Sequence, residues 1–272
     1  MSVIFLHDSS WPGFLCAVAE FLNALPAPTR VAGPGFQASL ADETVPVFTD
    51  GERARRLLAR LAARQPPTER SRVLRAIEAA FSSDTPGADH AAACMIAKLF
   101  KKGPAALDEI GTEEGALFER AVKRLEREAH LFLGHTRFVE LADGSWFARI
   151  RPDCAVLPFI GEHFAARFAD MVWAIRDEGR GSGLTHRPGE GWQYWPVFDD
   201  PVQAASGQRL PVSANEEALQ AAWTKYHRMI AIRERRNPRL QKSFLPSKFQ
   251  HEGEPMDSLP PPVHRERNDV AY

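Results

Sequence analysis

The chain has 272 residues, of which 44% are hydrophobic and 25% are charged, and its formal net charge is −1. These values are typical of a globular protein with one large domain or two modest ones. A net charge near zero excludes a protein that coats nucleic acid through its overall charge. Any such binding must therefore come from local clusters of basic residues.

The cysteines and the hydropathy restrict the compartment and the cofactors. Cys16, Cys94 and Cys154 are far apart and form no CxxC pair, which argues against thiol-only metal sites and suits a reducing compartment. No HxxxH spacing of a zinc site occurs. The apolar runs near the N-terminus are too short for a signal peptide or a membrane span. We expect a cytoplasmic protein without a metal ion, a cofactor or a membrane contact.

Residues 1–110 are predicted to form a mainly helical region that starts with a short strand. The strand covers residues 3–6, and Ser10 is expected to cap the helix that follows. Residues 45–48 are a possible second strand. Residues 50–102 have the apolar spacing of consecutive helices.

Two polar groups in this region allow alternative interpretations. His7 and Asp8 follow the first strand and are either a catalytic pair or ordinary polar residues at a strand end. Several arginines lie on one predicted helix and form either a phosphate site or a solvated helix face: Arg53, Arg55, Arg56, Arg60 and Arg64.

A long helix is predicted at residues 113–132, at the start of a second region that covers residues 111–250. At about 100° per residue, Glu128 lies within the apolar stripe of this helix, whereas His130 lies on the opposite side. A carboxylate on an apolar face must be paired or neutralised, because burial of an isolated charge is very costly. Glu128 is therefore either the partner of a buried arginine or a functional acid.

Two pairs of predicted strands flank a predicted helix in the same region. Residues 136–141 and 145–151 have strand character and are separated by the turn signal Asp143-Gly144. Residues 155–168 have helical spacing, and two more strands are predicted at 171–177 and 182–187. Strand, strand, helix, strand, strand is the order of an antiparallel sheet with a helix on one face.

Several short motifs in this region and near the C-terminus resemble an uncharacterised bacterial family linked to DNA metabolism or repair. The motifs are E-A-H at 128–130, R-P-D at 151–153, H-F-A-A-R-F-A-D at 163–170, R-D-E-G-R at 176–180 and R-E-R-R-N-P-R-L at 233–240. Members of that family are encoded beside a radical-SAM protein, and some are fused to a uracil-DNA glycosylase domain. The resemblance covers roughly residues 1 to 250 and implies a context in DNA repair without defining a reaction.

Charged residues on the predicted helix and strands suggest a site. His163 and Arg167 are four residues apart on one side of the helix, which suits a phosphate or carboxylate partner. Asp177 and Glu128 are candidates for acid and base, with His163 assisting. The alternative is a buried salt-bridge network of Glu128, Asp177, Arg167 and Arg180 that stabilises the core.

Trp192, Tyr194 and Trp195 lie in a predicted loop rich in glycine and proline. Exposed aromatic rings on a loop can stack on unpaired bases, at about 1–3 kcal/mol per base. Such a loop can equally fold down over the sheet as a lid.

The C-terminal part of the chain concentrates positive charge. Ser213 and Glu216 have the spacing of a capping box at the start of a helix. Residues 225–248 contain eight lysines and arginines and one glutamate, a net charge of +7 in a chain that is −1 overall. Such segregation suits contacts with the phosphate backbone, and the candidate residues are Arg235, Arg236, Arg239 and Lys242. Residues 251–272 are predicted to be a disordered tail.

We therefore expect an α+β fold in which a helical N-terminal half packs on a ββαββ antiparallel unit, followed by a basic C-terminal helix pair. The first hypothesis is a DNA-binding accessory that works with a radical-SAM protein or a uracil-DNA glycosylase, with His163, Arg167 and Arg180 lining a groove near the basic residues. The second is an enzyme that acts on damaged or modified DNA through Glu128, His163 and Asp177. The third is a protein adaptor whose basic helix docks on a partner.

Overall fold

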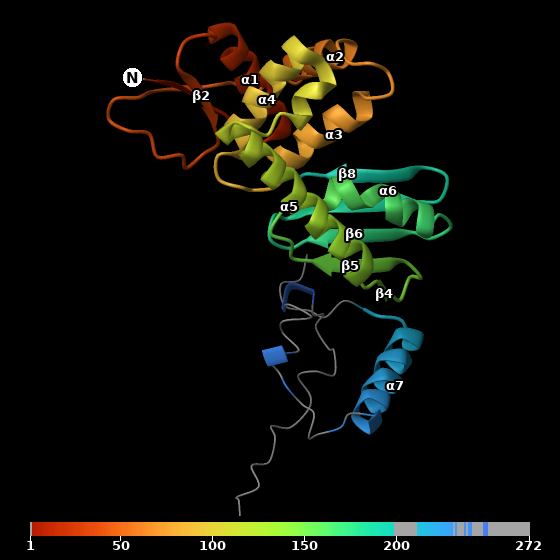
Figure 1. Ribbon diagram of the computed structural model, residues 1–272. Helices are drawn as coiled ribbons and strands as arrows, with labels where there is room; N and C mark the ends of the chain where they lie inside the picture. Colours follow the sequence, from red (N-terminus) through yellow and green to blue (C-terminus); the bar gives the residue numbers. More distant parts are fainter. Residues whose placement is uncertain are drawn as a thin grey trace, which may run out of the picture. The chain divides into compact units, whose positions relative to one another are not determined.

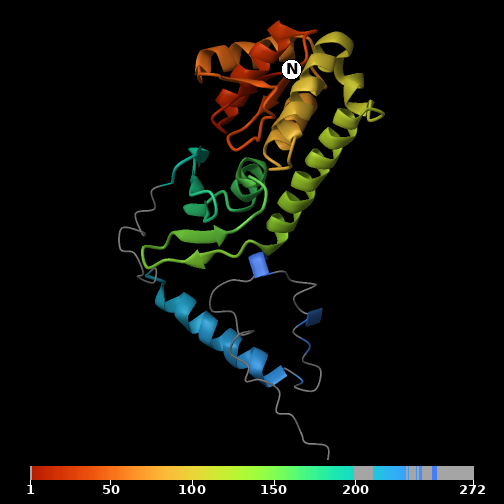
Figure 2. The same cartoon turned by 90° about the vertical axis from the view of Figure 1, so that its left-hand side faces the viewer.

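The structure is a computed structural model that divides the chain into two compact units (Figures 1 and 2). It describes residues 2–198, 211–230, 232, 237, 239–240 and 247–249. Among the described residues, the first unit contains 2–130 and 153–156, and the second contains 131–152 and those from 157 to 249. The long helix α5 (Glu113–His135) begins in the first unit, and its last residues belong to the second.

A three-stranded parallel sheet opens the first unit. Its order is β2 (Thr29–Ala32), β1 (Val3–Leu6), β3 (Glu43–Pro46), and the helix α1 (Trp11–Ala24) connects β1 to β2. The predicted cap is confirmed, because Ser10 Oγ accepts the N–H of Gly13 at 3.0 Å. Strand β2 was not predicted.

Helices complete the first unit, as the apolar spacing predicts. They are α2 (Gly51–Ala63), α3 (Arg70–Phe81), α4 (Ala88–Lys102), a 3₁₀ helix η1 (Gly103–Asp108) and most of α5. Their facing sides form one hydrophobic core that includes the fully buried Leu61, Ile77, Ile96 and Leu99. The sequence predicts an apolar stripe on α5 of Leu117, Ala121, Leu125 and Phe132; the last three are buried and Leu117 is half-buried.

The second unit contains a five-stranded mixed sheet with the order β4-β5-β6-β7-β8. The strands are β4 (Val139–Glu140), β5 (Trp146–Ile150), β6 (Trp173–Asp177), β7 (Ser182–Arg187) and β8 (Gly191–Trp195). The expectation of a purely antiparallel sheet is wrong at one pair, since β5 and β6 are parallel. Helix α6 (Leu157–Arg167) connects these two strands, and a helical crossover returns the chain in the same direction.

Strand β8 occupies the sequence that was predicted to be an aromatic loop. It pairs with β7 in antiparallel register, with Tyr194 opposite Leu184. The turn between the two strands contains Gly189 at φ 80°, and β8 begins with Gly191 at φ 77°, conformations that favour glycine. Trp192 and Tyr194 therefore lie on one face of the sheet and Trp195 on the other, and the segment forms a strand instead of a lid.

Helix α6 lies on one face of the five-stranded sheet (Figure 2). Trp173, Ile175 and Leu184 point to this face and are buried. Trp192 of β8 packs directly on Gly161 of α6, where a Cβ would come within 2.8 Å of the indole ring. The α+β fold class is thus confirmed.

The C-terminal part begins with α7 (Ala214–Ile230), and a short 3₁₀ helix η3 (Ser247–Phe249) follows. Ser213 caps α7 as predicted, because its Oγ accepts the N–H of Glu216 at 3.0 Å. Most of the second predicted basic helix and the predicted tail at 251–272 lie outside the described residues. Within the residues that the structure describes, no helix is both long and apolar enough to cross a membrane.

Candidate nucleic-acid interface

Glu128 anchors a distant segment of the first unit to α5. Its Oε1 accepts the N–H of Asp153 at 3.0 Å, and its Oε2 accepts the N–H of Cys154 at 2.7 Å. The Cys154 thiol donates to the carbonyl of Ser83, and burial together with the neighbouring carboxylate raises the pKa of Cys154 to about 12. Glu128 is 6% exposed, and its two carboxylate oxygens accept hydrogen bonds from the backbone N–H groups of residues 153 and 154. The backbone of this segment therefore supplies the hydrogen bonds that a buried carboxylate needs.

Asp177 is engaged in a similar way in the second unit. Its Oδ1 accepts the N–H groups of Gly179 and Arg180, and its Oδ2 lies 3.0 Å from Nη1 of Arg180. Arg180 also donates to the carbonyl of Pro152 at 3.0 Å. Desolvation raises the pKa of Asp177, and Arg180 opposes this rise. The structure thus brings together Asp177 and Arg180, at the tight turn between β6 and β7.

His163 and Arg167 lie on exposed positions of α6. The guanidinium of Arg167 lies 5.6 Å from the ring centre of Phe168, and the His163 ring lies 5.3 Å from that of Phe164. Among the described residues, no hydrogen bond joins His163 to the fully buried Asp177. Glu128 belongs to the other unit.

His7 and Asp8 have different partners in the first unit. The N–H of Ser9 donates to Nδ1 of His7, so Nε2 carries the ring hydrogen and donates to Asp89, 3.1 Å away. Asp8 accepts hydrogen bonds from Ser10 and Thr49 instead, which lower its pKa. Both nitrogens of the buried imidazole are thus engaged within the protein.

The structure describes one of the four candidate basic residues near the C-terminus. Arg235, Arg236 and Lys242 lie outside the described residues, whereas Arg239 is described and exposed. Helix α7 carries the exposed Lys225 and Arg228.

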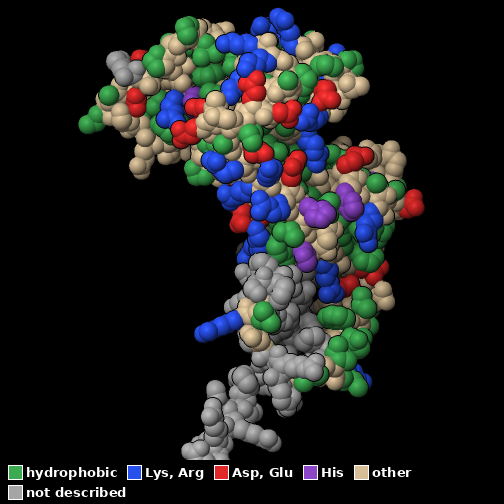
Figure 3. Space-filling view, viewed as in Figure 1, with side chains coloured by type: hydrophobic (Ala, Val, Ile, Leu, Met, Phe, Trp, Pro, Cys, Tyr) green, Lys and Arg blue, Asp and Glu red, His purple; other side chains and the backbone are tan. Residues whose placement is uncertain are grey.

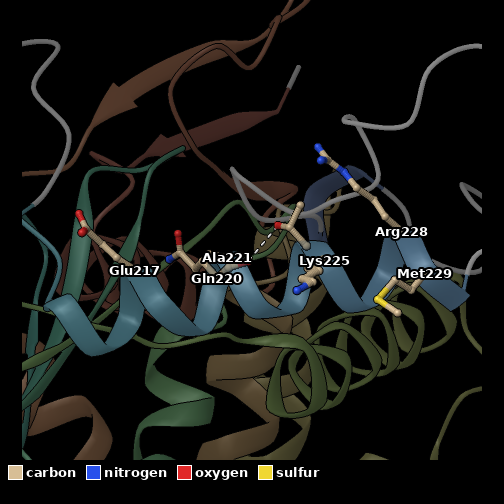
Figure 4. Close-up of a pocket in the computed structure, with 7 residues that line it drawn as sticks. Glu217, Gln220, Ala221, Lys225, Arg228 and Met229 are labelled. Atoms are coloured by element: carbon tan, nitrogen blue, oxygen red, sulfur yellow. Dashed lines mark hydrogen bonds between the residues drawn. The ribbon is translucent and has the colours of Figure 1, made fainter.

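A shallow cavity of about 700 Å³ lies beside α7, and its described lining residues all belong to this helix (Figure 4). They include Glu217 and Gln220 near its first turns and Lys225, Arg228 and Met229 near its end. The lining therefore has mixed charge, with one carboxylate beside two cations.

The N-terminus of α7 is firmly attached to strand β4. Glu216 is 3% exposed, and its Oε1 lies 3.2 Å from Nη2 of Arg137. Ser213 Oγ donates to the carboxylate of Glu140 at 2.7 Å. The rest of α7 exposes its apolar stripe, with 56% exposure at Leu219, 47% at Trp223 and 54% at Tyr226.

Sequence reasoning missed a basic surface on α5, which we call the α5 basic face: Arg120, Lys123, Arg124 and Arg127. All four side chains are exposed, opposite the buried Ala121 and Leu125. Figure 3 shows Lys and Arg side chains gathered along this part of the first unit. The spacing i, i+3, i+4, i+7 is the signal that could have revealed it.

The three arginines of the α5 basic face have exposed side chains, and that of Arg124 also forms a hydrogen bond with the Cys154 side chain. Lys123 pairs with Glu119 at 2.6 Å. For Arg120, Arg124 and Arg127, the described part of the chain contains no carboxylate within ion-pair distance. The three side chains span about 60° of the helix circumference and about 10 Å along its axis. A surface of this kind fits successive phosphates of a nucleic-acid backbone.

Comparison with protein families supports one part of the resemblance, namely that the chain contains a domain of unknown function. A family described as "Domain of unknown function (DUF4130)" matches residues 86–252, more than half of the chain. The chain belongs to this family. The match includes α5, the five-stranded sheet and α7, and thus most of the candidate site residues. No curated protein matches the chain.

Proposed function

We propose that this protein binds DNA through the α5 basic face and acts in DNA metabolism or repair. The proposal rests on the alignment of Arg120, Arg124 and Arg127 along one exposed strip of a helix whose opposite side is buried. Buried packing holds the helix, so the cations are presented in a defined geometry. Guanidinium groups are well suited to phosphate because they donate in a planar fork.

The resemblance supplies the biological partner in this proposal. It implies an accessory role beside a radical-SAM protein or a uracil-DNA glycosylase. Arg235, Arg236, Arg239 and Lys242 would add phosphate contacts, and Arg167 on α6 is a further exposed cation. Arg180 is less suited to this role, because it is bound to Asp177 and Pro152.

Binding is favoured over catalysis by the state of the two candidate acids. Glu128 accepts two backbone N–H groups, and Asp177 accepts two backbone N–H groups and a guanidinium. Both carboxylates are buried. A general acid or base must reach a substrate proton within hydrogen-bond distance, so these partners argue against such a role.

Fluorescence anisotropy with labelled duplex and single-stranded DNA over a salt series tests the proposal. Wild-type binding is expected to weaken steeply with salt, because phosphate contacts release counterions. The triple variant Arg120→Ala/Arg124→Ala/Arg127→Ala should bind more weakly to every sequence. The slope of log K against log salt should fall by about 1 for each phosphate that the variant no longer binds.

Helix α2 offers a matched control with the same change in charge. Arg55, Arg56 and Arg60 are also exposed but spread over about 140° of their helix. Their triple alanine variant should lose much less affinity than the α5 variant. Equal losses of affinity in the two variants would show that only net charge matters and would contradict a specific interface on α5. If the wild type does not bind DNA at low salt, the proposal is wrong.

A second candidate function is that of a protein adaptor, and the exposed apolar stripe of α7 favours it. Leu219, Trp223 and Tyr226 are each about half exposed on a helix whose first turn is anchored by Glu216. Apolar side chains gathered on one exposed helix face are typical of a protein contact. The resemblance points to the radical-SAM protein as the partner. Co-purification of the two proteins, lost in Trp223→Ala/Tyr226→Ala but kept in the α5 triple variant, would support this function.

A further inference from the structure

The face of the five-stranded sheet opposite α6 has an unusual composition. Strand pairing places Phe147, Ala174, Thr185 and Gln193 in one row across it. The next row on the same face contains Arg149, Arg176, Gly183 and Trp195. Residues of alternate rows point to α6, as Trp192 does through its contact with Gly161. This face thus combines aromatic, arginine and amide side chains.

A cavity of about 740 Å³ lies on this face, within the second unit. Its lining includes Phe147, Thr185, Gln193, Trp195 and Phe198. The volume falls within the range of about 300–1,000 Å³ that is typical of small-molecule sites. A flat ring with polar edges is therefore a ligand of suitable size.

Two aromatic side chains of the cavity are held in place by the strands below them. Trp195 is 43% exposed, and its Nε1–H donates to Thr185 Oγ1 at 2.9 Å. Phe198 lies over Gly183, where a Cβ would come within 2.5 Å of the ring, and its N–H donates to the carbonyl of Gly181. Because these rings are oriented before a ligand arrives, stacking on them requires little additional ordering.

The charges of the lining favour an uncharged ring over a phosphate. Among the described lining residues, Arg187 is the one cation, and Asp143 and Glu190 are carboxylates. A phosphate would be repelled by the two acids. The same oxygens and the Gln193 amide can form hydrogen bonds with the edge of a base, as carboxylates do with exocyclic amino groups.

We propose that this cavity binds an unpaired nucleobase of single-stranded DNA, stacked on Trp195. Single-stranded nucleic acids are commonly bound by aromatic side chains on a sheet, with cations along the backbone. Arg149 lies in the same row as Trp195. Its guanidinium lies 5.7 Å from the ring centre of Phe147, and its Nε lies 3.7 Å from a carboxylate oxygen of Glu178. This inference rests on the proposed function, DNA binding, and adds that the bound DNA is single-stranded.

The test compares two labelled 12-nucleotide strands of equal phosphate number, one with all its bases and one with abasic sites in its central positions. Wild-type protein is expected to prefer the intact strand by about 5- to 150-fold for one stacked base. Trp195→Ala should remove this preference while the slope of affinity against salt stays as in the wild type. Trp195→Phe keeps a stacking ring and should keep most of the preference.

Tyr194→Ala is the matched control. Tyr194 is 41% exposed, lies next to Trp195 on the same strand and points to the opposite face. Its replacement should leave the preference unchanged. A wild type that binds both strands equally, or a Trp195→Ala variant that keeps the preference, would overturn the base pocket. If both strands bind equally and with strong salt dependence, the proposed DNA-binding function still holds. If neither strand nor duplex binds at low salt, both proposals are wrong.

Discussion

Nη1 of Arg180 lies 3.0 Å from Oδ2 of Asp177, a carboxylate with no exposed surface. The guanidinium is a main partner of this buried charge, together with two backbone N–H groups of the same turn. Removal of one member of a buried pair leaves the other charge uncompensated, which is strongly destabilising.

Arg180→Ala is therefore expected to lower the free energy of unfolding by about 3 kcal/mol. Urea denaturation followed by tryptophan fluorescence measures the change. Arg151→Ala is the control, because Arg151 pairs with Glu178 through a side chain that is 69% exposed. It should cost less than about 1 kcal/mol. Similar losses in the two variants would show that Arg180 is not needed to compensate a buried charge.

Glu128 gives a second prediction, which couples stability to thiol reactivity. Glu128→Gln keeps one acceptor oxygen but presents an NH₂ group to a backbone N–H that the carboxylate now accepts. The loss should be about 1–3 kcal/mol. Because this contact holds Cys154, whose thiol is buried and has a pKa of about 12, native-state labelling of Cys154 by a thiol reagent should become faster.

Glu126→Gln controls for the change of charge on the same helix, since Glu126 is exposed. It should alter neither the stability nor the labelling rate of Cys154 by a measurable amount. Peptide mapping after labelling separates Cys154 from Cys16 and Cys94. Unchanged labelling in Glu128→Gln would mean that the carboxylate does not hold the segment.

The same residue shows how far the sequence could predict this protein. Helical periodicity correctly places Glu128 among the buried residues of α5, because Leu125 and Phe132 define that stripe locally. Its partners could not be predicted, since Asp153 and Cys154 lie 25 and 26 residues further along the chain. Their contribution is a pair of backbone N–H groups, which every residue other than proline carries.

Strand prediction failed where local signals are weakest. The segment that forms β2 is four residues long and lies between Pro28 and Gly33, so neither length nor alternation identified it. The parallel pairing of β5 with β6 depends on where α6 returns the chain, which no turn motif encodes. The α5 basic face, by contrast, was predictable from the spacing of Arg120, Arg124 and Arg127.

Glycine at position 13 is predicted to be required in the first turn of α1. A Cβ there would collide with the carboxylate of Asp8 and come within 2.7 Å of Thr49 Oγ1. Gly13→Ala should therefore displace the Asp8 carboxylate from its hydrogen bonds with Ser10 and Thr49 and destabilise the protein by about 1–3 kcal/mol. Gly51→Ala is the control, because Gly51 is the first residue of α2 and nothing lies within 4 Å of a Cβ at that position. It should be neutral or stabilising by up to about 1 kcal/mol, and a similar loss in both would contradict the steric argument.

Glu78 on α3 is expected to make stability fall with rising pH. Burial raises the pKa of Glu78 above its ordinary value of 4.5, and Arg75 opposes this rise. A raised pKa means that the folded state binds the proton more tightly than the unfolded state. Stability is therefore lost as the pH rises from 4.5 through the folded-state pKa.

The variant Glu78→Gln lacks this titration, so it should gain stability relative to the wild type at pH 7. Below pH 4.5, where the wild-type carboxyl is protonated in both states, the difference should shrink towards a constant that reflects the amide alone. Urea midpoints of both proteins, measured from pH 4 to pH 7, give the comparison. A stability advantage of Glu78→Gln over the wild type that grows as the pH falls would be the opposite of this expectation. That result would mean that the Arg75 charge outweighs desolvation at this position.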